Sequence, residues 1–279
     1  MNKSSKLAAI FFYNACDTLR NTPEILQTAL INANMKPLPL FNIHIPQTNL
    51  IPENARQYLR NEIQTLIRKL ENHFNIKLSL ERFSKSVARY NEYKMQMRQL
   101  DTQVTNGVLG FKQFVLLADS LAGTPVNGKI EKIRNFILQA TTDSLPVQQE
   151  ELKKRPRILL SGILRPPQSL IEVFENAGLF IVGNDIASLS RTYFNNFSEK
   201  LTPEDYYVEF YFNHIPCPTL LASSDHRLNY LIQLCQEKHA DGIIFLGEKY
   251  CEYEFFEFTY ITKKLREKEM STLELETHF

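Results

Sequence analysis

The sequence predicts an α/β protein with two Rossmann-like parallel-sheet domains joined by a helical segment. Its 279 residues suffice for about two domains. Short apolar runs alternate with helical patterns over residues 1–100 and again over residues 156–279, whereas residues 101–155 read as helices without a strand. We therefore expect an N-terminal α/β domain, a helical connector and a C-terminal α/β domain over these three ranges.

Local signals place the elements of the first range. The apolar run at residues 7–13 predicts a buried strand rather than a signal peptide, because polar residues follow it at once. Thr-Pro-Glu at residues 22–24 predicts a helix start, with a capping hydroxyl followed by proline. A second strand is predicted at residues 37–45. Apolar residues at three- and four-residue spacing predict a long helix after Pro52 and another after Ser79.

The later ranges continue this pattern. Residues 111–121 and 129–140 predict helices, and the polar stretch 148–157 predicts a linker. Beyond it, strands and helices alternate with short connections, which is typical of a parallel sheet covered by helices. Right-handed crossovers bring the carboxyl ends of such strands to one edge, where ligands bind. The predicted strands are 157–160, 179–183, 241–247 and 272–275. Helices are predicted at 166–177 and 254–268. A further predicted helix carries Leu228, Leu231, Ile232 and Cys235 on its apolar face.

Composition and charge exclude several classes of protein. The 32 Lys and Arg residues balance 31 Asp and Glu, and a net charge of +1 gives no strong field for nucleic acid or an anionic membrane. Only 9 glycines are present, and neither a P-loop nor a GxGxxG pattern occurs, which argues against P-loop ATPases and standard dinucleotide-binding enzymes. No apolar run reaches the ~20 residues that span a bilayer. We expect a cytoplasmic protein.

Two of the four cysteines follow predicted strands and precede an acidic residue. Cys16 comes after the first strand and before Asp17, and Cys251 comes shortly after residues 241–247 and before Glu252. A helix N-terminus favours the thiolate that binds metals, and thiolates suit iron–sulfur clusters. Two domains that face each other can bring both sulfurs to one cluster. The alternative is a pair of unrelated, partly buried cysteines.

A family pattern extends through nearly the whole chain and is weakest over about residues 100–150. Its segments, in chain order, are IFFYNACDTLRNTPEIL, PENARQYLRNEIQTLIRKLENHFNIKLSLERFSKSVARYNE, RILLSGILRPPQSLIEVFENAGLFIVGNDIASLSR and the stretch from YFNHIPCP onwards. In the last of these a buried strand runs into Lys-Tyr-Cys-Glu. Together these segments resemble the 2-hydroxyacyl-CoA dehydratase and benzoyl-CoA reductase subunit family, and they are similar to its 2-hydroxyglutaryl-CoA dehydratase D-component.

The resemblance implies an iron–sulfur enzyme that acts on a CoA thioester. Cys16 and Cys251 match two family cysteines that bind a [4Fe–4S]-type cluster between two α/β domains. The implied partners are a homologous sister subunit, an ATP-dependent activator protein that supplies electrons and the acyl-CoA substrate. The family's dehydratases reduce the thioester by one electron to a ketyl radical anion before the 2-hydroxyl leaves. Its benzoyl-CoA branch reduces an aromatic ring, and both activities stay open.

The chain departs from the family pattern at both ends. Relatives carry a preceding segment with another cluster cysteine and a further C-terminal stretch, so we expect a truncated chain with an incomplete first domain. Tyr253 takes a place where the family often has proline. Cys217, between Pro216 and Pro218, is a candidate extra ligand, although the prolines favour a loop role. The alternative to an enzyme subunit is a degenerate member without activity that serves as a partner or binding subunit.

Further candidate residues lie at strand ends of the predicted C-terminal domain. Ser161 and Gly162 can present backbone amides to a thioester or phosphate, although a tight turn explains them better. Asp185 and Arg191 can line the same substrate cleft, and the alternatives are a helix cap for Asp185 and a salt bridge for Arg191. Cys235 lies on an apolar helical face and is expected in the core.

Overall fold

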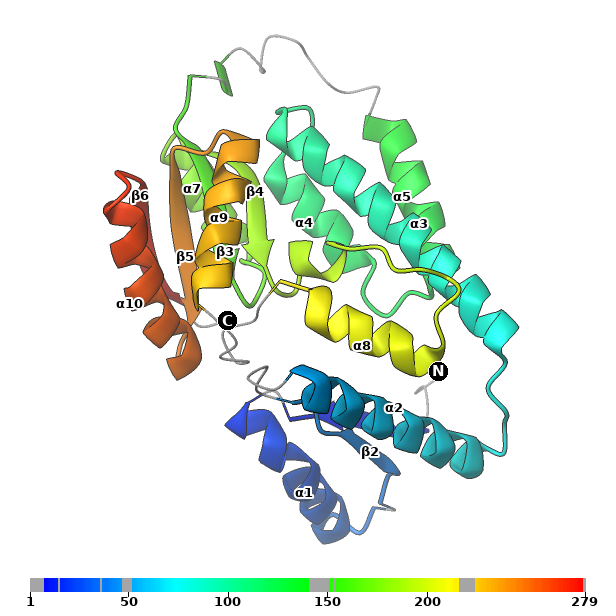
Figure 1. Ribbon diagram of the computed structural model, residues 1–279. Helices are drawn as coiled ribbons and strands as arrows, with labels where there is room; N and C mark the ends of the chain where they lie inside the picture. Colours follow the sequence, from blue (N-terminus) through cyan, green and yellow to red (C-terminus); the bar gives the residue numbers. More distant parts are fainter. Residues whose placement is uncertain are drawn as a thin grey trace. The chain divides into compact units, whose positions relative to one another are not determined.

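The protein has an α/β fold in which neighbouring strands run parallel (Figure 1). This confirms the fold class predicted from the alternation of apolar runs and helical patterns. Within the part of the chain that is described, no helix combines the length and the apolar character needed to cross a membrane. The computed structural model describes residues 8–14, 16–35, 37–46, 52–140, 151–152, 154–215 and 224–277.

The chain divides into two compact units. Unit 1 contains the residues up to Ser84 together with Ser198–Asn213, and unit 2 contains Lys85–Phe197 and the described residues that follow Asn213. This division differs from the predicted boundaries at residues 100 and 155, because one helix returns from the second half of the chain to pack in unit 1. The helices between those boundaries belong to unit 2.

Unit 1 contains a parallel pair of strands and the helix between them. β1 (Ile10–Tyr13) pairs in parallel with β2 (Leu40–Ile43), and α1 (Asp17–Asn32) follows β1. Both strands lie within the predicted runs at residues 7–13 and 37–45. The apolar patterns therefore located the strands correctly.

α1 begins at Asp17, well before Pro23, so the helix start predicted at Thr22 was wrong. The backbone of Cys16 is extended, with φ −144° and ψ 171°, and its carbonyl oxygen accepts the Arg20 N–H at 3.0 Å. The helix therefore starts as soon as the strand connection ends. Pro23 lies buried inside the helix, where it cannot donate the usual helical hydrogen bond.

The helix that returns to unit 1 is α8 (Pro203–Asn213), which the sequence pattern did not predict. It packs on α2 (Pro52–Phe74), the long helix predicted after Pro52. An ion pair between Arg60 and Asp205 at 2.7 Å joins the two helices. The buried side chains of this unit's core are Ile43, Leu59, Ile63 and Val208.

In unit 2, parallel strands lie side by side in the order β4, β3, β5, β6 (Figure 1). Each falls on a run predicted as a strand, although β4 continues beyond Gly183, so that Asp185 lies within it. The bounds are β3 Arg157–Gly162, β4 Phe180–Ile186, β5 Gly242–Glu248 and β6 Ser271–Thr277.

Helices precede and connect these strands. α3 begins at Leu80, as predicted, and enters unit 2 at Lys85. Gly178 follows α7 with a φ of +78°, the left-handed conformation expected of a glycine that ends a helix. The bounds are α3 Leu80–Thr105, α4 Phe111–Ser120, α5 Val126–Ala140, α7 Gln168–Asn176, the short 3-10 helix η1 Ser190–Thr192, α9 Ser224–Lys238 and α10 Glu252–Arg266.

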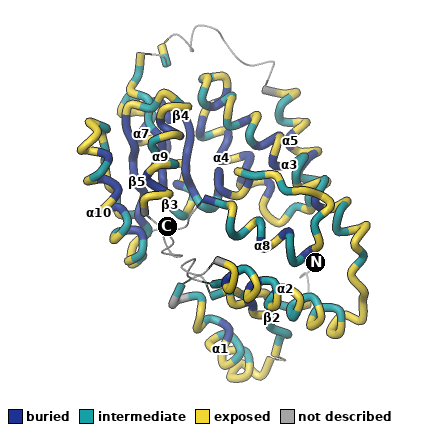
Figure 2. Tube along the Cα trace, in the orientation of Figure 1, coloured by how far each residue is buried: buried dark blue, intermediate teal, exposed yellow. Residues whose placement is uncertain are grey.

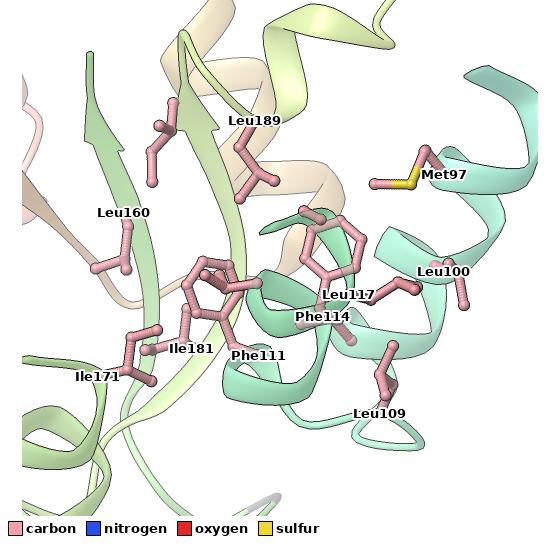
Figure 3. Packing of buried hydrophobic residues seen from close by; sticks show 14 of the residues in the cluster. Met97, Leu100, Leu109, Phe111, Phe114, Leu117, Leu160, Ile171, Ile181 and Leu189 are labelled. Carbon is pink, nitrogen blue, oxygen red and sulfur yellow. The ribbon is translucent and has the colours of Figure 1, made fainter. Parts of the chain in front are cut away.

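Both faces of the unit 2 sheet are covered. Leu159 and Phe245 pack against α9 and α10 on one face. Leu160 and Leu246 belong to the cluster formed with α3, α4 and α7 on the other face, part of which Figure 3 shows. β3, β4 and β5 are accordingly buried along most of their length (Figure 2), whereas the edge strand β6 alternates between exposed and half-buried residues. A sheet covered on both faces leaves its strand ends as the place where polar side chains meet ligands.

Candidate functional site

The strand order places a topological switch point at the carboxyl ends of β3 and β5. β3 leads through α7 to β4 on one side, and β5 leads through α10 to β6 on the other. The two ends are neighbours, because Gly162 pairs with Leu246. A Cβ atom on Gly162 would lie 2.6 Å from the Leu246 carbonyl oxygen, so the backbones approach closely here. Open α/β sheets bind ligands at such a point, which makes it the candidate site of unit 2.

Cys251 lies at this switch point, in the turn between β5 and α10. Its N–H donates to the Glu248 carbonyl oxygen at 2.9 Å, and its own carbonyl oxygen accepts the Glu254 N–H at 3.1 Å. The residue is half-buried and directly precedes α10. The structure therefore places it after a strand and at a helix N-terminus, as the sequence pattern predicted.

Cys16 has the same local setting in unit 1. It is half-buried, follows β1 and directly precedes α1. A small pocket at the carboxyl ends of β1 and β2 is lined mainly by apolar surface, and its polar lining residues include Asn14, Arg20 and His44. Cys16 and Cys251 belong to different units, so a cluster that both of them hold stays a prediction.

A buried cluster of charged side chains lies at the ends of β3 and β4. Arg191 donates to the Asp185 carboxylate from Nε at 2.7 Å and from Nη2 at 2.9 Å. Arg227 Nη2 lies 3.1 Å from the same carboxylate. The Ser161 hydroxyl donates to Asp185 at 3.0 Å and accepts a hydrogen bond from Arg227 at 2.9 Å. Asp185 and Arg227 are fully buried.

The structure thus brings together the residues predicted for a substrate cleft. Ser161 and Gly162 end β3, Asp185 lies on the neighbouring strand, and Arg191 follows in η1. Arg191 makes the salt bridge that was its alternative interpretation, and its partner is Asp185. Because these side chains bond to one another, contact with a substrate remains a prediction.

Burial and charge shift the pKa values of two carboxyl groups in this region. Burial raises the pKa of Asp185, but the charges of Arg191 and Arg227 outweigh it and hold the pKa below its ordinary value. Glu254 is also fully buried, and burial raises its pKa to about 7 although it accepts the Glu248 N–H. Asp185 is therefore ionised at neutral pH, whereas Glu254 holds a proton part of the time.

Arg227 and Glu254 were not predicted as members of the site. Both lie in phase with an apolar helical stripe, Arg227 before Leu231 on α9 and Glu254 before Phe258 on α10. A charged residue within such a stripe indicates a buried charge that needs partners. This signal was present in the sequence and could have identified both residues.

The described cysteines differ in their suitability as metal ligands. Cys235 packs in the core, where burial raises its pKa to about 12, in agreement with its predicted core position. Cys16 and Cys251 are half-buried thiols at helix N-termini, and sulfur donors of this kind fit iron–sulfur chemistry. Cys217 lies outside the described residues. Within the described ranges, no group of three or more His, Cys, Asp or Glu residues is gathered to hold a metal ion.

The comparisons with known proteins agree on one family. The model of the family "2-hydroxyglutaryl-CoA dehydratase, D-component" matches residues 2–279. The chain is 24% identical over 286 residues to the beta subunit of (R)-phenyllactyl-CoA dehydratase of Clostridium sporogenes, a match that covers 97% of this chain and 70% of that protein. It is also 24% identical over 282 residues to subunit beta of the lactoyl-CoA dehydratase of Anaerotignum propionicum, covering 97% of this chain and 69% of that protein.

Proposed function

Because the chain belongs to the family of the 2-hydroxyglutaryl-CoA dehydratase D-component, we propose that it is the beta-type subunit of a 2-hydroxyacyl-CoA dehydratase. Such an enzyme acts on a CoA thioester and removes its 2-hydroxyl group. The observation that carries the proposal is the half-buried thiol of Cys251 at a helix N-terminus and a topological switch point. The two relatives named as dehydratase beta subunits support it.

The proposed cofactor is a [4Fe–4S] cluster held by Cys16 and Cys251. When bound, the cluster supplies the one-electron chemistry that this class of dehydration requires. Each cysteine directly precedes a helix, and cysteine sulfur is the donor that iron–sulfur clusters prefer. In this proposal the remaining ligands come from Cys217, from the sister subunit or from water.

The proposed position of the thioester is beside the end of β3. Ser161 and Gly162 lie at that end, next to Cys251 in the connection after β5. Arg191 and Arg227 lie against the carboxylate of Asp185, and Arg227 also lies 3.3 Å from Glu257, so both guanidinium groups have carboxylate partners. In this proposal the backbone amides at the end of β3 bind the thioester, and the hydrogen bonds among Ser161, Asp185 and Arg227 hold that strand end in place.

The proposed assembly includes other chains. A homologous sister subunit is expected because the relatives named above are beta subunits. An ATP-dependent activator protein delivers the electron in this proposal, and the enzyme works in the cytoplasm.

Iron binding tests the proposal. We expect the anaerobically purified full chain, reconstituted with ferrous iron and sulfide, to be brown and to carry about four iron atoms. Cys16→Ala and Cys251→Ala should each lose the iron and the visible absorbance, whereas the core variant Cys235→Ala should keep both. A wild-type chain that stays colourless and iron-free contradicts a cluster held by this chain alone. A Cys235→Ala variant that loses iron like the other two contradicts the assignment of Cys16 and Cys251 as ligands.

A further inference from the structure

The turn that carries Cys251 has an unfavourable backbone conformation. Tyr250, the residue before it, has a φ of +69°, in the left-handed region that a tyrosine rarely adopts. The Tyr250 side chain is 88% exposed, so it is not packed in the interior of the protein. Something in the protein must therefore hold this turn in place.

Hydrogen bonds close the turn on both of its sides. The Cys251 N–H donates to the Glu248 carbonyl oxygen, and Lys249 donates its N–H to Thr277 of β6 at 2.7 Å. From the side of α10, Glu254 Oε2 accepts the Glu248 N–H at 2.9 Å. The Glu254 carboxylate thus links the last residue of β5 to the first turn of α10, across the loop that contains Cys251.

Glu254 places a carboxyl group at a buried helix position where an apolar side chain is expected. It is fully buried, in phase with the apolar stripe of Phe258, Ile261 and Leu265. Its Oε1 atom is buried without a hydrogen-bond partner among the described residues. An apolar side chain there would avoid the cost of burying a carboxyl group. The carboxyl group adds the hydrogen bond to Glu248, together with an electrostatic attraction to Arg227 and Arg191.

We propose that Glu254 is a positioning residue that fixes the turn carrying Cys251, so that the thiol is presented in one geometry. The effect on the turn follows from the contacts above and does not depend on any cofactor. Its consequence for iron binding rests on the proposed function. The two parts can therefore be tested separately.

The first test compares Glu254→Met with Glu254→Gln in the full chain without iron. Methionine has a similar length and suits a buried apolar site but lacks the acceptor, whereas glutamine keeps a carbonyl oxygen for the Glu248 N–H. Hydrogen–deuterium exchange followed by mass spectrometry reports on residues 248–254. We expect exchange there to be about tenfold faster in Glu254→Met and close to wild type in Glu254→Gln.

Glu257→Met is the matched control. Glu257 lies on the same helix, is largely buried and has its carboxylate 3.3 Å from Arg227. The Glu257→Met variant should leave hydrogen–deuterium exchange in residues 248–254 unchanged. If Glu254→Met accelerates exchange equally over residues 259–266, or if Glu254→Gln behaves like Glu254→Met, then Glu254 only stabilises α10 and the positioning role is overturned.

The second test measures iron release to a chelator from the reconstituted protein. We expect release about tenfold faster from Glu254→Met than from Glu254→Gln or wild type. Equal release from all three overturns the role of Glu254 toward the cluster. A wild-type chain that binds no iron, combined with the expected exchange pattern, leaves the positioning of the turn supported and removes the proposed function instead.

Discussion

At the scale of a single residue, Asp185 decides whether two guanidinium groups can be buried at the end of β4. Its carboxylate accepts hydrogen bonds from Arg191 and lies against Arg227. These contacts offset the cost of removing the charges from water, which is high for any unpaired ion. Removal of the carboxylate would leave both arginines without the counter-charge that they share.

Asp185→Asn should therefore lower the free energy of unfolding by about 3–5 kcal/mol at pH 7, measured by urea denaturation. The pKa of Asp185 is lowered in the folded protein, so its stabilisation is present above the ordinary value of 3.8 and is lost as the pH falls through the folded-state pKa. The difference between wild type and variant should shrink accordingly below that pH. Asp119→Asn, which removes an exposed ion pair with Arg165, is the control and should cost less than about 1 kcal/mol. A difference that does not change with pH would contradict this account.

Cys235 offers a second prediction at this scale. Burial raises its pKa to about 12, so the thiol is neutral and enclosed in the core at ordinary pH. Iodoacetamide at pH 8 should modify Cys235 in the native protein at least about a hundredfold more slowly than in urea, because reaction requires local or global unfolding. Mass spectrometry of peptides measures both rates. Rapid native labelling would show that the α9 core is more open than described.

At the scale of elements, the pairing of β3 with β5 depends on Gly162. A Cβ atom there would lie 2.6 Å from a backbone oxygen of Leu246, which cannot move without shifting a strand. Gly162→Ala should therefore lower the free energy of unfolding by about 1–3 kcal/mol in urea denaturation. Gly183→Ala on β4 is the matched control, because its Cβ would meet side-chain atoms of Lys238, at 3.1 to 3.4 Å, and no backbone atom. An equal cost for the two variants would mean that the close strand approach is not the cause.

The elements that could be predicted from sequence are those whose signals are local. β3 and β5 are apolar runs bounded by turns, and α3 begins after Ser79 as its spacing indicated. α8 escaped prediction because its apolar and charged residues do not separate onto two faces, so its place depends on contacts with α2 that lie far away in sequence. The start of α1 was predicted too late, because Pro23 favours the first helical position whereas the helix already begins at Asp17.

In the candidate site, too, the residues that could be predicted are those with local signals. The sequence pattern located Cys251 and Ser161 at strand ends, because each depends on a strand and the turn after it. It did not reveal that Asp185, Arg191 and Arg227 share one buried network, since that arrangement needs the side-by-side order of β4, β3 and β5. Whether Cys16 and Cys251 meet depends on how the two units are placed, which no local pattern encodes.

At the scale of the whole molecule, the two units differ in how much structure supports their strands. Among the described residues, β1 pairs only with β2, and their side chains alternate between exposed and more buried positions. In unit 2, β3 has a neighbour on each side, and every residue of β4 is buried. A pair of strands is marginally stable, whereas a larger covered sheet resists opening. Local unfolding should therefore begin in unit 1.

Native hydrogen exchange of the isolated full chain tests this difference. Amides of residues 10–13 and 40–43 should exchange at least about tenfold faster than those of residues 157–162 and 242–248, because local opening of β1 and β2 costs less free energy than opening the central strands. Leu59→Ala, in the core of unit 1, should increase this difference in exchange rate, because it should accelerate exchange only in residues 10–13 and 40–43. Ile244→Ala, in the core of unit 2, is the matched substitution and should reduce the difference in exchange rate between the two sheets. Equal protection of both sheets in the wild-type chain would mean that the units open together, as one cooperative structure.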